Sequence, residues 1–212
     1  MAIRQVIVNA DDFGYSFSVN KGIIEGHKQG IITSTSVMID AIAADEAVGL
    51  LEYPNLAVGL HFVPSSDNDV EEELDRQIER FISVTGNRPT HIDIHKPSED
   101  DINLKETVGR YAKDKNIPYR YSGEAHFIDS FFGPLSNGEI SVDLLKNAFN
   151  RTSEGLNEIM THVGYSDDYL NTHSSYNTLR EEELKAVCSQ EIKDFIELQR
   201  IELTNWSKIK AQ

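Results

Sequence analysis

The chain has 212 residues, with 20 Lys and Arg against 35 Asp and Glu, and its formal net charge is −15. That balance argues against partners such as nucleic acid or an anionic membrane surface, because both are bound through clustered cations. The length fits one domain, residues 1–212, with a sizeable core. Cys188 is the only cysteine, so the sequence offers neither an intrachain disulfide nor a thiolate metal cluster.

The start of the chain, MAIRQVIVNADD, has neither the long apolar run nor the small-residue cleavage site of a signal peptide. No stretch approaches the roughly 18 apolar residues that a membrane span needs. The sequence therefore predicts a cytoplasmic protein.

Apolar, β-rich runs recur along the chain, and most intervals between them carry helical periodicity. The runs are residues 4–10, 32–39, 56–62, 90–95, 117–121, 156–163 and 200–206. Helical patterns fill residues 18–30, 70–86, 104–116, 141–155 and 180–192, with Gly30 as an expected helix end and Ser141 as an expected N-cap. Residues 122–141 lack clear periodicity and are predicted to form a long functional loop or a short extra hairpin.

The alternation of strands and helices predicts an α/β protein with a mostly parallel sheet of about seven strands and outer helices. The pattern fits either a barrel or an open doubly wound sheet. In both folds, sites are built at the carboxyl ends of the strands.

Polar residues gather at these strand ends. Asp11 and Asp12 follow the first run, and His61, His95 and His162 end three later ones. A carboxylate with two neutral imidazoles is a common ligand set for a divalent ion that keeps a position open for water. The adjacent carboxylates can then divide the work, with one binding the ion and the other taking a proton from the water.

The sequence HIDIH supports the same site. Alternate residues of a strand share a face, so His91, Asp93 and His95 point one way, toward the centre of the sheet. Ionisable groups on an inner face need partners, which a metal or a hydrogen-bond network would supply. We expect Asp93 to orient a ligating histidine and His91 to pack in the interior, with His91 as the alternative to His95 as a ligand.

Each of these features also has a simpler explanation. Two aspartates at a strand end are usually part of a turn, and Asp12 could cap a helix that begins near Ser16. A single histidine in an apolar strand, such as His61, is more often a core residue. The combination of three histidines with the aspartate pair favours a metal site.

The motifs VNADDFGYS, GLHF, PTHIDIH, EIMTHVGY and LREEEL stand in the order found in the YdjC-like carbohydrate deacetylases, which include chitooligosaccharide deacetylases. The resemblance extends from Ile7 to about Leu203. It implies a TIM-like, incomplete (β/α) barrel and removal of acetyl groups from N-acetylated sugars with the help of a divalent ion. Members of this family are commonly dimeric, so a homodimer is expected.

The resemblance also assigns roles to individual residues. Metal ligands fall on Asp12, His61 and His95, and the general base falls on Asp11. His162 matches the histidine of an HPGY-type motif, in which Val163 here replaces proline. Arg180 begins an R-x-x-E-L pattern, and the segment after His61 is shorter than is usual in the family.

The sequence thus predicts a metal-dependent hydrolase that removes N-acetyl groups from amino sugars or short oligosaccharides. Mg²⁺ is the expected ion, with Zn²⁺ or another divalent ion as the alternative. His162, with a pKa near neutrality, is expected to protonate the leaving amine, and backbone N–H groups near Gly14 to help stabilise the oxyanion.

Aromatic residues near the strand ends could stack on the sugar ring or simply pack in the core. The candidates are Phe62, Tyr165 and the segment 126–132. Two alternative functions stay open, a non-catalytic sugar-binding protein on the same fold and a different metal hydrolase such as a phosphoesterase. The sequence shows no evident Lys/Arg clamp for phosphate near the expected ligands.

Overall fold

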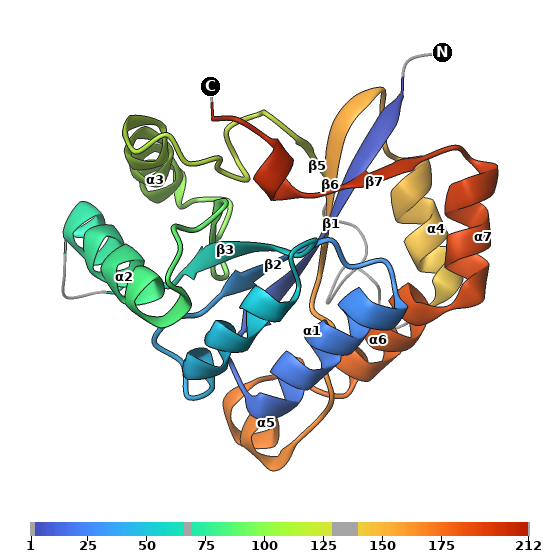
Figure 1. The fold of residues 1–212 in the computed structure, drawn as a ribbon, viewed down its shortest axis with the longest axis horizontal. Coiled ribbons are helices and arrows are strands. Elements are labelled where there is room, and N and C mark those ends of the chain that lie inside the picture. The colour runs from blue at the N-terminus through green and yellow to red at the C-terminus, as the bar shows by residue number, and fades with distance from the viewer. Residues whose placement is uncertain (1–2, 66–68, 129–139, 212) are drawn as a thin grey trace.

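The computed structural model describes residues 3–65, 69–128 and 140–211. A parallel sheet that curls into a half-barrel forms its centre (Figure 1). The strands are β1 (Arg4–Phe13), β2 (Ser34–Val37), β3 (Ala57–Phe62), β4 (Ile92–Ile94), β5 (His126–Ile128), β6 (Gly155–Thr161) and β7 (Glu202–Thr204). Their order is β4-β3-β2-β1-β6-β5, with β7 also paired to β1. The predicted incomplete (β/α) barrel of about seven parallel strands is confirmed.

The long strand β1 organises the sheet. One of its edges pairs with β6 along residues 4–10. Its other edge is shared, because β7 pairs with residues 5–7 and β2 pairs further along, from Asn9 to Phe13. The register against β2 shifts between Ala10 and Phe13, so β1 is irregular where it carries Asp11 and Asp12. Such irregularities occur often beside active sites, where they redirect a side chain.

Helices cover the outside of the sheet. They are α1 (Phe17–Gln29), α2 (Val70–Thr85), α3 (Ile102–Asp114), α4 (Val142–Asn150), α5 (Asp168–His173), α6 (Leu179–Cys188) and α7 (Gln190–Leu198), with the 3-10 helices η1 (Ala44–Glu52) and η3 (Trp206–Lys208). In Figure 1, α2 and α3 lie together on one side of the sheet and α4 and α7 on the other. One large apolar core lies between these helices and the sheet.

Local sequence signals explain where several helices begin and end. Ser141 caps α4, as predicted, by accepting a hydrogen bond from the backbone N–H of Leu144. Ser16 caps α1 in the same way, through the backbone N–H of Val19. Gly86 follows α2 with φ 71°, a left-handed conformation that glycine adopts without steric cost.

Two predictions of secondary structure are wrong. Residues 117–121 do not form a strand, and only Tyr119 makes a bridge, to Ile92. Pro118 has no N–H with which to extend the pairing, and the N–H of Ser122 bonds back to the carbonyl of Tyr119 and turns the chain. The fifth strand is instead β5, in the stretch predicted as a loop or hairpin. The helical pattern of residues 180–192 belongs to two helices, since Ser189 has an extended conformation and its side chain caps α7.

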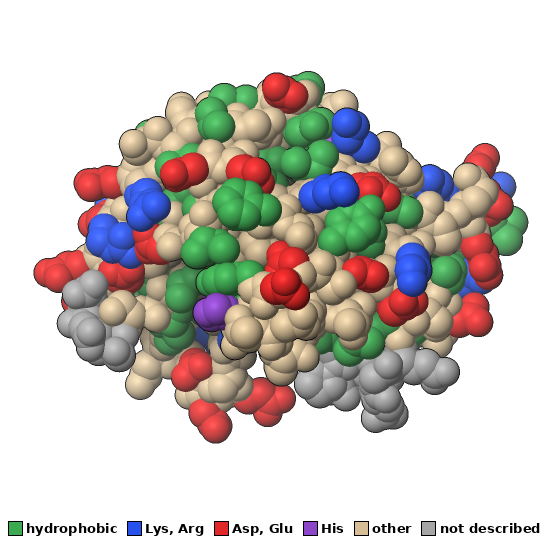
Figure 2. Space-filling model, turned by 90° about the horizontal axis from the view of Figure 1, so that it is seen from below, with side chains coloured by type: hydrophobic (Ala, Val, Ile, Leu, Met, Phe, Trp, Pro, Cys, Tyr) green, Lys and Arg blue, Asp and Glu red, His purple; other side chains and the backbone are tan. Residues whose placement is uncertain are grey.

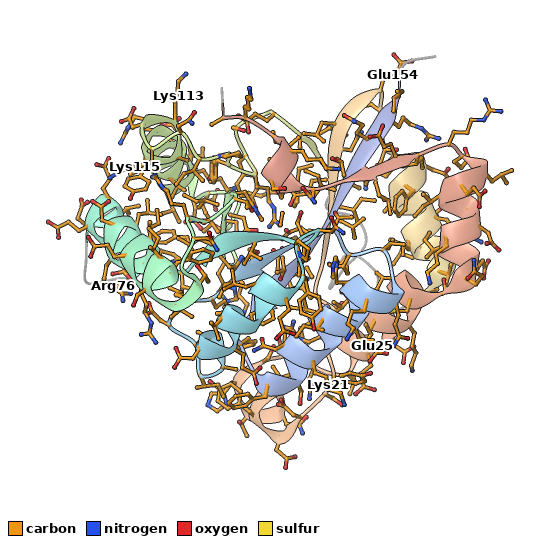
Figure 3. The ribbon with its side chains drawn as sticks, in the orientation of Figure 1. Lys21, Glu25, Arg76, Lys113, Lys115 and Glu154 are labelled. Carbon is orange, nitrogen blue, oxygen red and sulfur yellow. The ribbon has the colours of Figure 1, made fainter. Side chains whose placement is uncertain are left out.

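Several charged residues on or beside the helices face outward. Arg76 on α2, Lys113 and Lys115 at the end of α3, and Lys21 and Glu25 on α1 all lie at the periphery (Figure 3). Figure 2 views the molecule from below, the side toward which β1 runs, and shows acidic and basic side chains interspersed over that face. Among the described residues, no helix has the length and apolar character to cross a membrane.

Candidate metal and catalytic site

Three of the predicted site residues come together at the carboxyl ends of β1, β3 and β4. Nε2 of His61 lies 3.2 Å from Oδ1 of Asp12 and 3.0 Å from Nδ1 of His95. Nδ1 of His95 lies 3.3 Å from the same carboxylate oxygen. Two atoms bound to one ion at about 2.1 Å, at angles of roughly 90–110°, are themselves about 3.0–3.4 Å apart. The three donor atoms therefore fit one divalent ion.

The backbone of Asp12 is unusual for a residue with a side chain. Its φ is 72°, in the left-handed region, which costs an aspartate on the order of 1 kcal/mol. It does not cap α1, because Ser16 does so. Oδ1 of Asp12 is buried and has no hydrogen-bond partner among the described residues. A buried carboxylate oxygen without a partner is costly, and a bound cation would remove that cost.

The second oxygen of Asp12 is held by Arg180, whose Nη2 donates to Oδ2 at 2.7 Å. Burial opposes the charge of Asp12, but Arg180, His61 and His95 outweigh it and hold the pKa of Asp12 well below its usual range. Arg180 was carried over from the family pattern, and the structure places it directly behind the candidate ligand.

Asp93 orients His61, as expected. Nδ1 of His61 lies 2.5 Å from Oδ1 of Asp93, which places the imidazole proton on Nδ1 and leaves the lone pair of Nε2 facing His95 and Asp12. Burial lowers the pKa of His61, but the carboxylates of Asp93, Asp12 and Asp11 outweigh burial and raise it to about 10. A metal ion at this site would therefore compete with a proton.

His91 does not reach the candidate metal position. Its ring stacks on Trp206, with ring centroids 5.3 Å apart, and Thr90 lies within hydrogen-bond distance of its Nδ1. Burial lowers the pKa of His91 to about 4, so the imidazole is neutral at pH 7. Gly59 makes room for this ring, because a Cβ at residue 59 would lie 2.4 Å from it.

Asp11 points toward a different partner. Arg120 binds its carboxylate with both terminal nitrogens, at 2.8 and 2.7 Å, and Asn9 donates to the same carboxylate at 2.7 Å. Oδ2 of Asp11 lies 3.9 Å from Nδ1 of His61. A second cluster of potential ligands, Asp11, His61 and Asp93, is therefore occupied by a guanidinium.

Arg120 is the main residue that the sequence analysis missed. Its buried guanidinium also pairs with Asp93 at 3.0 Å and with Glu158 at 3.0 Å. Burial raises the pKa of Glu158 to about 6 against the effect of Arg120. The only sequence signal was a charged residue inside the β-rich run IPYRY, which a buried strand would not tolerate without partners.

His162 follows β6 and lies near Tyr176. The two rings meet edge to face with centroids 5.6 Å apart, and the backbone N–H of His162 donates to Glu183. The expectation of a near-neutral pKa for His162 is wrong, because burial lowers it to about 4 despite the carboxylates of Asp12 and Asp11.

A cleft of about 770 Å³ opens above these residues. Its walls include Asp11, Asp12, His61, His95, His162, Arg180, Tyr15, Tyr121, Phe127, Tyr176, Lys96 and Lys105. This volume is within the usual range for small-molecule sites. The combination of apolar rings and polar groups suits a sugar, which has apolar ring faces and hydroxyl edges.

The structure changes three expectations about the cleft. Phe62 is buried in the core, and Tyr165 donates to Glu25 outside the cleft, so neither is placed to stack on a sugar there. Phe127 does line the cleft, whereas residues 129–132 lie outside the described residues. The N–H of Gly14 donates to Oδ1 of Asn20 at 2.5 Å and is therefore not free to stabilise an oxyanion.

The chain is similar in sequence to known proteins. The family model "YdjC-like protein" matches residues 5–68 and 63–198. A carbohydrate deacetylase of Clostridium beijerinckii is 35% identical over 97% of this chain and 100% of its own length. One from Brevibacillus brevis is 32% identical over 97% and 99%.

Solved structures show the same fold. A protein of Enterococcus faecalis V583 has a TM-score of 0.84 and 25% identity, covering 99% of this chain and 100% of its own. A family 4 acetyl xylan esterase from Clostridium thermocellum, in complex with a cobalt ion, has a TM-score of 0.59 and 9% identity over 97% and 89%. The chain belongs to the YdjC-like protein family.

Proposed function

We propose that this protein is a metal-dependent hydrolase that removes the acetyl group from an N-acetylated amino sugar or short oligosaccharide. The observation that carries the proposal is the meeting of Asp12, His61 and His95 at one point of a sugar-sized cleft, with Asp11 beside them. The names of the relatives support the reaction class. Mg²⁺ is the expected ion, and Zn²⁺ or another divalent ion is the alternative.

The charges around the site support a divalent ion. Arg120 pairs with the carboxylates of Asp11, Asp93 and Glu158, and Arg180 pairs with Asp12. Four buried carboxylates thus face two guanidiniums, and once an ion displaces the extra proton of His61, two negative charges lack compensation from the protein. A divalent cation supplies that compensation, whereas unbalanced buried charge is strongly unfavourable.

When bound, such an ion polarises the acetyl carbonyl and makes a bound water more acidic. Asp11 takes the water's proton. Its carboxylate lines the cleft, is not one of the three proposed ligands, and is fixed in orientation by Arg120 and Asn9. A fixed orientation matters because a general base must lie within hydrogen-bond reach of the proton that it takes.

His162 donates a proton to the leaving amine. Its imidazole is neutral in the resting protein, since burial lowers its pKa to about 4. Negative charge developing on the acetyl oxygen raises the proton affinity of His162, so its imidazole takes a proton from solvent and passes it to the amine as the C–N bond breaks; Asp11 returns the proton it took from water to solvent.

The other two candidate functions are separable by experiment. A phosphoesterase needs free cations for the phosphate, but Arg120 and Arg180 are both engaged by carboxylates. Lys105, which donates to the backbone carbonyl of Ser98 at 2.7 Å, and Lys96 also line the cleft, so the phosphate assay decides this alternative. A protein that only binds sugar needs no general base, and Asp11 is present.

The test is acetate release from a panel of N-acetylated mono- and disaccharides, with and without Mg²⁺, Zn²⁺, Mn²⁺ or Co²⁺. Phosphate release from sugar phosphates is measured in parallel. Metal-dependent acetate release is the expected result. Phosphate release alone, or sugar binding without turnover, would replace the proposal with one of its alternatives. The single domain, the cytoplasmic location and the homodimer stay predictions from the sequence and the family resemblance.

A further inference from the structure

We propose that Glu183 is a positioning residue, which holds His162 and Tyr176 in their places in the cleft. The inference deepens the proposed function and rests on it, because it concerns the residue that we assign as proton donor. Glu183 acts through these neighbours, since it is absent from the cleft wall that His162 and Tyr176 both line.

The contacts of Glu183 join three parts of the chain. The residue comes from α6 and is fully buried. One carboxylate oxygen accepts the backbone N–H of His162 at 2.6 Å, directly after β6. The other oxygen accepts the hydroxyl of Tyr176, from the segment that precedes α6. The carboxylate therefore links the end of a sheet strand to the segment that forms one wall of the cleft.

Tyr176 passes this restraint on to the site. Its ring meets the ring of His162 edge to face, with centroids 5.6 Å apart and an interplanar angle of 65°. Its backbone carbonyl accepts the Nε–H of Arg180 at 2.9 Å, and Arg180 in turn holds Asp12. Displacing the Tyr176 hydroxyl would thus loosen the proposed proton donor and the arginine behind a proposed metal ligand.

A carboxylate at this buried position costs stability. Burial raises the pKa of Glu183 to about 7, although the hydrogen bonds from Tyr176 and His162 oppose that shift. An apolar residue of similar size would avoid this cost, as replacements of buried charged groups often do. Packing alone therefore does not explain a carboxylate at residue 183, whereas its contacts to His162 and Tyr176 do.

The geometry predicts which substitution is tolerated. A backbone N–H can only donate, so His162 needs an acceptor oxygen at residue 183. A tyrosine hydroxyl can either donate or accept. Glutamine can therefore keep both contacts, with its oxygen toward His162 and its amide N–H₂ toward a rotated Tyr176 hydroxyl. Methionine fills a similar volume and keeps neither contact.

The experiment compares Glu183→Gln and Glu183→Met with Glu182→Met as a matched control. Glu182 is the exposed neighbour on the same helix, where it pairs with Lys185. Acetate release and bound metal are measured on each folded variant. We expect Glu183→Met to lose roughly 10–100-fold in kcat with little change in KM or metal content, as for a misplaced catalytic group. Glu183→Gln and the control should stay within about threefold of wild type.

A second readout needs no substrate. The His162 imidazole is followed by NMR as pH varies, with its signal assigned by loss in His162→Asn. In wild type and Glu183→Gln its pKa should lie well below about 6.5, the ordinary value, and in Glu183→Met it should move toward that value. If the wild type releases no acetate, the proposed function fails, while this titration still tests the positioning of His162.

Two outcomes would overturn the inference. One is a Glu183→Met protein with wild-type kcat and an unchanged His162 titration. The other is a Glu183→Gln protein as impaired as Glu183→Met while its His162 titration stays that of wild type. The first would make the contacts irrelevant to the site, and the second would assign the effect to the charge of Glu183 instead of its acceptor geometry.

Discussion

At the scale of single residues, Arg120 compensates much of the negative charge that is buried in the interior. Its guanidinium is shared by Asp11, Asp93 and Glu158, all of them buried. Removing one partner from a buried charge network leaves the other charges uncompensated, which is more damaging than removing the whole network.

We therefore predict that Arg120→Met destabilises the fold by about 3–5 kcal/mol at neutral pH. Arg120→Lys should cost less, because it keeps the charge but loses the two-pronged contact with Asp11. Urea unfolding measures both variants. Arg110→Met is the control, because the side chain of Arg110 is 66% exposed and makes surface contacts with Glu71 and Thr107. Equal stability of Arg120→Met and the control would refute the role given to Arg120.

Glu183 makes a prediction about pH and stability. Its pKa is raised from 4.5 to about 7 in the folded protein, so the folded state holds this proton more tightly than the unfolded state does. The resulting stabilisation is full below pH 4.5 and is lost as pH rises through 7. A glutamine at residue 183 does not titrate, so the Glu183→Gln variant does not lose this stabilisation as pH rises.

The stability of Glu183→Gln relative to wild type should therefore improve between pH 4.5 and pH 8, by up to about 3 kcal/mol. Urea unfolding at a series of pH values measures the difference between the two proteins, which cancels the titration of the groups that they share. A difference that does not vary with pH would show that Glu183 titrates normally in the folded state.

At the scale of elements, the sheet brings the site together through strand neighbours. Because β3 pairs with β4 in register, His61 lies beside Asp93, and the inner faces of the strands carry a connected polar network. His91 on the same side is accommodated only because residue 59 on β3 has no side chain.

Gly59→Ala should destabilise the protein by about 1–3 kcal/mol, the usual cost of overpacking a core. The added Cβ would lie 2.4 Å from the His91 ring, which cannot retreat because Trp206 stacks on its face. Gly49→Ala is the control, since nothing lies within 4 Å of its Cβ position. The cost of Gly59→Ala should shrink in a His91→Ala background, and an unchanged cost there would exclude the clash as its cause.

The sequence predicted the elements that have strong local signals. Ser141 and Gly86 mark helix ends through capping and left-handed geometry that depend only on nearby residues. The short strand β5 was missed, because its three residues carry no periodic pattern and are placed by pairing with β6. The interruption at Ser189 was missed because the residues around it favour helix.

The site likewise contains residues that a local pattern predicts and residues whose role depends on distant contacts. Asp12, His61 and His95 could be predicted to converge, because parallel strands align their carboxyl ends. Arg120 and Glu183 could not, because their importance lies in partners far along the chain. Arg120 meets Asp11 across 109 positions of sequence, and no local pattern records such a contact. The low pKa of His162 likewise follows from burial that only the folded structure shows.

At the scale of the whole molecule, the half-barrel keeps its apolar core apart from the charged residues of the candidate site. The apolar core between sheet and helices supplies stability, while the strand ends hold a cluster with more carboxylates than guanidiniums. In the proposed function, Asp12, His61 and His95 hold a divalent ion at these strand ends, and Asp11 removes a proton from water without binding the ion.

The decisive measurement of these roles compares metal content and acetate release in wild type, Asp11→Asn and His61→Ala. Asp11→Asn should keep its metal and lose roughly 10²–10⁴-fold in kcat, the usual contribution of a positioned general base. His61→Ala should lose metal and activity together. An Asp11→Asn protein that turns over at the wild-type rate, or that loses its metal, would contradict the division of roles between the two aspartates.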